Sequence, residues 1–126
     1  MIPPELRYTD QHEWLAVQPD GRVRVGITDF AQDSLGDIVF VALPSSDEDV
    51  AAGQPVGEVE STKSVSEVYA PLAGRIVRRN DAVETAPETI NDDPYGEGWL
   101  VEIEPAADFD AAEFLDAGGY AALIES

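Results

Sequence analysis

Short runs of β-forming residues, separated at regular intervals by Gly- and Pro-containing turn signals, restrict this chain to a fold of many short strands. The clearest pair of runs covers residues 55–61 and 65–70, and between them lies Lys63, the only lysine of the chain. Two such runs joined by a short polar turn pair as a hairpin, which predicts that Lys63 is presented at an exposed tip. A lysine in a turn is most often simply solvated, so the spacing alone leaves that interpretation open beside a functional one.

The other runs predict a mainly β fold, either a small barrel or a sandwich with helical additions. Residues 13–17 and 23–27 form a predicted hairpin, because the Pro19-Asp-Gly21 turn joins them and apolar residues alternate along the second run. The most apolar stretch, residues 37–43, is predicted to be a central strand. Further strands are predicted over residues 75–78 and 99–103.

Helices are predicted at three places around these strands. A helix over residues 29–35 is capped by Thr28 or Asp29, with Asp29 and Gln32 at the spacing of a capping box and Gly36 as the stop. A short helical turn is predicted over residues 87–90. A longer helix is predicted over residues 108–117, ending at the Gly118-Gly119 pair.

The inventory of reactive side chains is too small for an ordinary enzyme. The chain has no cysteine, one histidine and one lysine, which removes disulfides, thiol nucleophiles, iron–sulfur ligation and the common zinc sites. His12 is a single histidine at the first predicted strand, where a structural role is the more frequent one. We therefore expect no catalytic residue and no metal, and we expect that any chemistry is carried by an attached group.

The charge of this chain excludes two classes of partner. Its formal net charge is −19, and no Lys or Arg follows Arg79. Such a surface repels nucleic acid and anionic membranes, and favours proteins with basic docking faces, although solubility alone explains it equally well. No apolar run approaches the roughly 18–20 residues that span a bilayer. The N-terminal residues resemble neither a signal nor a transit peptide, so we expect a complete intracellular chain.

Six segments, in order and in register, closely resemble the H-protein family of the glycine cleavage system. They cover the chain from about Tyr8 to Ile124 and comprise residues 12–14, 25–33, 35–41, 60–66, 69–74 and 93–100. The resemblance implies a lipoyl/biotinyl-type barrel-sandwich hybrid with short peripheral helices and a C-terminal helix, forming one carrier domain over residues 1–126. It also implies a cytoplasmic carrier subunit rather than an enzyme.

The resemblance assigns a cofactor and a set of partners. It implies lipoate in amide linkage to Lys63, attached by lipoate-attaching enzymes. The arm would take an aminomethyl group from a pyridoxal-phosphate glycine decarboxylase to a tetrahydrofolate-dependent aminomethyltransferase. A dihydrolipoyl dehydrogenase would then reoxidise the dithiol.

This chain departs from the family pattern at three positions around the lysine and at Ser34. Thr62 and Ser64 stand where relatives commonly have Val and Ala, and Glu67 stands where they have Asp. These are small-for-small and acid-for-acid changes, so lipoylation remains the expectation. Ser34 occupies a place where some relatives have His, and no role of that His transfers to it.

Three other functions remain as alternatives. A biotinyl carrier domain shares the fold, but that family places Met on both sides of its lysine, and the only Met here is Met1. A lipoyl donor or relay protein, serving protein lipoylation without glycine turnover, is compatible with every residue considered. An unrelated enzyme is the alternative with the least support.

Two carboxylates are candidates for protecting a loaded arm. An aminomethyl cargo carries an ammonium near neutral pH, and a cleft that shelters it needs an anionic acceptor. Glu67 lies four residues after Lys63, and Glu13 lies on the first predicted strand beside Trp14. The competing interpretation is that both are solvated acids among the 26 of the chain.

Overall fold

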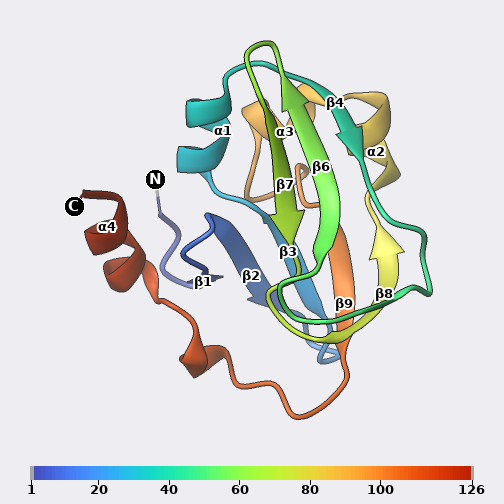
Figure 1. Ribbon diagram of the computed structural model, residues 1–126. Coiled ribbons are helices and arrows are strands. Elements are labelled where there is room, and N and C mark those ends of the chain that lie inside the picture. The colour runs from blue at the N-terminus through green and yellow to red at the C-terminus, as the bar shows by residue number, and fades with distance from the viewer. Residues whose placement is uncertain (1, 126) are drawn as a thin grey trace.

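Two antiparallel sheets face each other in the computed structural model, which describes residues 2–125 (Figure 1). The six-stranded sheet has the order β1 (Arg7–Tyr8), β2 (Glu13–Val17), β3 (Val23–Ile27), β9 (Val101–Pro105), β8 (Gly74–Arg79), β5 (Asp49–Val50). The three-stranded sheet has the order β4 (Ile38–Ala42), β6 (Pro55–Ser61), β7 (Val65–Tyr69). This two-sheet, mainly β architecture with short helices confirms the predicted fold class.

The hydrophobic core fills the space between the sheets. Alternation along β3 turns Val23, Val25 and Ile27 inward, and the β2–β3 hairpin pairs Leu15 with Val25 as its spacing predicted. Both sheets supply the buried cluster, which comprises Leu15, Val23, Val25, Ile27, Ile38, Val41, Val50, Val56, Val59, Val68, Ala70, Leu72, Ile76, Val83, Ile90, Leu100, Val101 and Ile103.

Short helices lie around the sheets: α1 (Asp29–Leu35), α2 (Asp81–Thr85), α3 (Glu88–Asp92), the 3₁₀ helix η1 (Ala111–Glu113) and α4 (Ala117–Glu125). The predicted first helix is confirmed with Thr28 as its cap, whose hydroxyl accepts a hydrogen bond from the Ala31 N–H. The Gln32 amide donates to the Asp29 carboxylate, 2.8 Å away. Both residues lie inside the helix, so their bond does not form the predicted capping box at the N-cap. Within residues 2–125, no helix combines the length and apolar character that crossing a bilayer requires.

The prediction that the most apolar run forms a central strand was wrong. β4 lies at the edge of its sheet. Its only neighbour is β6, because β6 pairs on its other side with β7. A register shift between Ile38 and Phe40 interrupts this pairing. Val39 and Phe40 are consequently 56% and 49% exposed. Within the run, Ile38 and Val41 are buried and Leu43 packs partly buried against the core, so its apolar content does not reflect burial of both faces.

The prediction of a helix over residues 108–117 was also wrong. The segment after β9 runs as an extended loop with η1, and α4 begins only at Ala117 (Figure 1). Asp116 explains the difference, since its carboxylate accepts the Gly119 N–H at 2.8 Å and its carbonyl accepts the Tyr120 N–H at 2.9 Å. The glycine pair that suggested a helix end therefore lies in the first turn of a helix.

Replacing Gly118 with alanine tests this placement of α4. A Cβ at Gly118 would lie 3.6 Å from the nearest Asp116 oxygen, an ordinary contact, and alanine favours helix over glycine. We expect Gly118→Ala to raise the free energy of unfolding by about 0.5–1 kcal/mol in urea titrations. Gly21→Ala is the matched control and should lower it, because Gly21 has φ of 88° in the β2–β3 turn. A loss of stability in Gly118→Ala would contradict a helix through this residue.

Candidate functional site

Lys63 lies at the exposed tip of the β6–β7 hairpin, as predicted. The tip is closed by local hydrogen bonds: the Ser61 N–H donates to the Ser64 carbonyl at 2.8 Å. The Ser61 hydroxyl accepts the N–H groups of Lys63 and Ser64 at 3.3 and 3.1 Å. Because these bonds satisfy the backbone of the turn, the base of the lysine is fixed while its side chain remains free to move.

A second segment holds the same tip from the side. The Thr62 N–H donates to the carbonyl of Asp37, in the connection between α1 and β4, at 3.1 Å. Asn91, at the end of α3, braces that connection: its Nδ2 donates to the Gly36 carbonyl and its Oδ1 accepts the Ile38 N–H, both at 2.9 Å. Sequence reasoning missed Asn91, because its partners are distant in the chain.

Gly36 gives the lysine side chain a path toward α1. A Cβ at this position would lie 3.4 Å from Cε of Lys63, and the residue has φ of 84°, which favours glycine. The stem of Lys63 therefore lies against bare backbone at the C-terminal end of α1. On its other side, α1 borders a cleft.

The cleft has a volume of about 300 Å³ and lies between α1 and the β6–β7 hairpin. Its walls are mainly apolar, with Ile27, Ala31, Leu35, Val59 and Val68 among the lining residues. Its polar lining comprises Gln11, His12, Glu13, Ser34, Ser66 and Glu67, without a lysine or arginine. An apolar chain with a cationic end matches this distribution of surfaces.

Both candidate carboxylates line this cleft, so the structure brings Glu13 and Glu67 together. Glu13 is 2% exposed, and Glu67 is exposed on β7. The carboxylate of Glu13 accepts the Thr9 hydroxyl at 2.8 Å and the Tyr69 N–H at 2.9 Å, which ties β2 to β7 across the two sheets. Burial raises the pKa of the Glu13 carboxyl, and the hydrogen bonds from Tyr69 and Thr9 oppose this shift.

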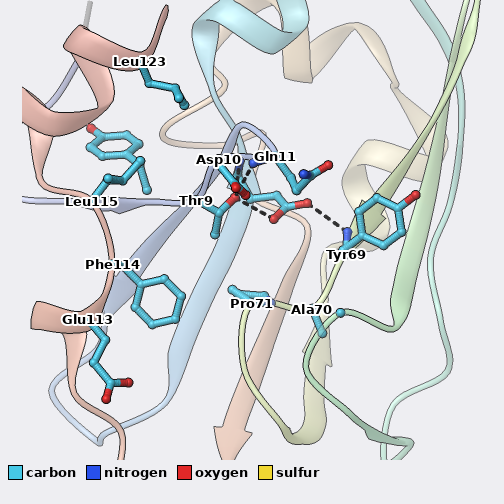
Figure 2. Close-up of a pocket in the computed structure, with 13 residues that line it drawn as sticks. Thr9, Asp10, Gln11, Tyr69, Ala70, Pro71, Glu113, Phe114, Leu115 and Leu123 are labelled. Atoms are coloured by element: carbon cyan, nitrogen blue, oxygen red, sulfur yellow. Dashed lines mark hydrogen bonds between the residues drawn. The ribbon is translucent and has the colours of Figure 1, made fainter.

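A second hollow, of about 470 Å³, also has Glu13 in its lining; Figure 2 shows this hollow. Its lining includes Tyr69 at the end of β7, Pro71 just after it, and Phe114, Leu115 and Leu123 from the C-terminal segment. Figure 2 draws the hydrogen bond that the N–H of Tyr69 donates to the Glu13 carboxylate. Glu13 lines both hollows and so forms part of the wall between them.

His12 makes specific side-chain contacts at the edge of the cleft. It lines the cleft, its ring centroid lies 4.9 Å from that of Phe30 on α1, and its Nδ1 lies 2.8 Å from the hydroxyl of Tyr120. Trp14 and Trp99 are both buried. No local pattern in the sequence signalled the contact of Tyr120 with the site.

Comparison with known proteins gives concordant matches. The family model described as glycine cleavage H-protein matches residues 6–126. The chain is 53% identical to the glycine cleavage system H protein of Nocardia farcinica, covering 98% of this chain and 97% of that one. It is 55% identical to that of Mycolicibacterium gilvum, covering 94% and 93%. A crystal structure of the protein from Mycobacterium marinum superposes with a TM-score of 0.89 at 48% identity, covering 99% of this chain and 100% of that one.

Removing the Asn91 side chain should loosen the hairpin tip. In Asn91→Ala the buried Ile38 N–H loses its acceptor, which costs about 1–3 kcal/mol of unfolding free energy. We expect hydrogen exchange of the Thr62 amide to accelerate, because the carbonyl of Asp37 is no longer held in place. The Gly53 amide, bonded to Ala70 at the opposite end of the hairpin, is the internal control and should keep its rate. Unchanged exchange at Thr62 would show that the tip is held without Asn91.

Proposed function

This chain belongs to the glycine cleavage H-protein family, and we propose that it carries lipoate on Lys63 and shuttles aminomethyl groups between the enzymes of that system. The partners would be a pyridoxal-phosphate glycine decarboxylase, a tetrahydrofolate-dependent aminomethyltransferase and dihydrolipoyl dehydrogenase. A lipoate-attaching enzyme would load the carrier first. The proposal places the protein in the cytoplasm as a carrier subunit without catalytic residues of its own.

The observation that carries this proposal is the placement of the sole lysine. Lys63 is exposed on a tip that two independent sets of hydrogen bonds hold, and its stem rests on Gly36 beside the cleft. The cleft suits the group chemically, because its walls are apolar and its polar lining includes two carboxylates. A dithiolane on a flexible stem would find apolar walls there, and a cationic cargo would find an anionic acceptor.

Lipoate, joined by an amide to Nζ of Lys63, would supply a disulfide that is reduced as it accepts the aminomethyl group. The remaining work falls to residues of this chain. The hairpin holds the attachment point, and the apolar cleft walls exclude water from the cargo. Glu13 and Glu67 accept hydrogen bonds from the ammonium, with Glu13 already oriented by Thr9 and Tyr69.

Moving the only lysine tests the attachment site. In the double variant Lys63→Arg with Arg75→Lys the amino-acid composition is kept, and the new amine lies on β8 at a side chain that is 55% exposed. We expect intact mass spectrometry to show no lipoyl addition and a reconstituted glycine cleavage assay to show no carrier activity. Arg75→Lys alone should be lipoylated once, at Lys63. Modification at position 75 of the double variant, or retained activity, would overturn the assignment.

The same reconstituted assay separates the shuttle from a lipoyl relay. A lipoylated carrier that supports no glycine turnover with the three enzymes, but passes its lipoyl group to another protein, would be a relay.

Neutralising the two carboxylates should expose the cargo. A charge-assisted hydrogen bond contributes about 1.5–3 kcal/mol, so Glu13→Gln should shorten the lifetime of the loaded protein about tenfold or more. Exposed Glu67 contributes less, and Glu67→Gln should shorten it about twofold to fivefold. Lipoylation and dithiol reoxidation should be unchanged in both. Glu48→Gln, in the exposed loop before β5, is the control; lifetimes equal to that control would exclude a protective role.

A further inference from the structure

A tyrosine of the C-terminal helix joins two residues beside the arm cleft. The hydroxyl of Tyr120 lies 2.8 Å from Nδ1 of His12 and 2.7 Å from the hydroxyl of Thr28. Thr28 caps α1, which borders the cleft, and His12 lines the cleft itself. Tyr120 and Thr28 are fully buried, so neither hydroxyl can turn to water for a partner.

Counting protons gives the direction of both hydrogen bonds. The Thr28 oxygen already accepts the Ala31 N–H, and among the described residues its hydroxyl has only Tyr120 as a further partner. If Thr28 donates to Tyr120 and Tyr120 donates to Nδ1 of His12, both contacts are made and no proton is left over. If Nδ1 of His12 carried a proton, one of the two buried hydroxyl protons would have no acceptor, which costs free energy.

We propose that Tyr120 is a positioning residue that fixes His12 as a neutral imidazole with its proton on Nε2. The backbone of His12 supports such a specific placement. His12 has φ of 67°, a left-handed conformation that residues with a Cβ adopt at a cost, and its carbonyl accepts the Thr28 N–H at 3.1 Å. The same neighbour, Thr28, therefore holds His12 through the backbone and through Tyr120.

A neutral His12 adds no positive charge to a cleft whose charged lining consists of carboxylates. Glu13 on β2 and Glu67 on β7 line the cleft with it, Asp10 lies on the same turn, and Asp29 and Asp33 lie on α1 beside Phe30. These acids favour a protonated imidazole, whereas burial lowers the pKa of His12 and is the larger effect, with Asp10 opposing it. Burial also raises the pKa of Tyr120, which keeps the hydroxyl proton that it donates.

The consequence for the arm rests on the proposed function. A protonated His12 would pair with a cleft carboxylate and repel an ammonium cargo beside it. By holding the imidazole neutral, Tyr120 leaves Glu13 and Glu67 available to the cargo.

The single histidine makes a direct test possible. With ¹⁵N-histidine, long-range ¹H–¹⁵N spectra of the full chain report His12 alone and distinguish a protonated Nε2 from a protonated Nδ1. At a pH above the titration midpoint of His12, we expect the wild-type protein to have the imidazole proton on Nε2 only. Tyr120→Phe should give a mixture of tautomers and raise the titration midpoint by roughly half to one pH unit, because the neutral form loses a donor to Nδ1.

Tyr8→Phe is the matched control for Tyr120→Phe. The two rings stack with centroids 4.8 Å apart, both are fully buried, and the Tyr8 hydroxyl donates to the Pro3 carbonyl, away from His12. This variant should keep the wild-type tautomer and midpoint. The proposal is overturned if Tyr120→Phe gives the same spectrum as Tyr8→Phe.

The wild-type spectrum alone also decides the matter if Tyr120→Phe does not fold. A proton on Nδ1, or a mixture of tautomers, in the wild-type protein would overturn the proposal. None of these measurements needs lipoate, so they remain valid if the carrier assignment fails. In the lipoylated protein, Tyr120→Phe should shorten the lifetime of the loaded form relative to Tyr8→Phe, and equal lifetimes would overturn the electrostatic consequence for the arm.

Discussion

Tight fixation of the β6–β7 tip is the constraint on which the rest of the site depends. A swinging arm delivers its end to several partners only if its attachment point does not move, and a two-stranded hairpin alone is marginally stable in water. Here the Thr62 N–H is bonded to the α1–β4 connection, and Asn91 fixes that connection to α3. The tip is therefore held by tertiary contacts, while the lysine side chain is left exposed.

Burial of Glu13 makes its ionisation sensitive to any charge that enters the cleft. A raised carboxyl pKa means that folding favours the protonated form, so the stability that Glu13 contributes is present at low pH and lost as pH rises through that pKa. The ionised form is consequently under-compensated at neutral pH, although Thr9 and Tyr69 each donate to it. A cation in the cleft relieves this cost, and by linkage it lowers the pKa of Glu13. Under the proposed function, Glu13 would therefore favour a loaded over an empty cleft.

The parts of this structure that the sequence predicted are those that local patterns determine. Alternation and turn residues predicted the β2–β3 and β6–β7 hairpins. Glu13 and Glu67, chosen by a charge argument about the cargo that the family resemblance implies, line one cleft, and their role there stays a prediction. The edge position of β4 was missed because strand order depends on which neighbours pair, not on apolar content. The helix over residues 108–117 was predicted wrongly because a glycine pair in the sequence is compatible with either the end or the first turn of a helix. Only the hydrogen bonds of Asp116, which the sequence does not reveal, distinguish the two.

Tyr120 was beyond sequence reasoning for a different reason: its role comes from packing on the outer face of β2. Alternation turns Leu15 and Glu13 toward the facing sheet and Trp14 outward, where it belongs to a second buried cluster with Tyr8 and Tyr120. The C-terminal segment closes over this cluster, and Leu115 exchanges backbone hydrogen bonds with Tyr8. Residues 13–15 of β2 are therefore buried on both faces, whereas Val17 at the end of the strand is 53% exposed. Thr9 and Tyr69 hold the Glu13 carboxylate on the inner face, while the cluster around Trp14 covers the outer face.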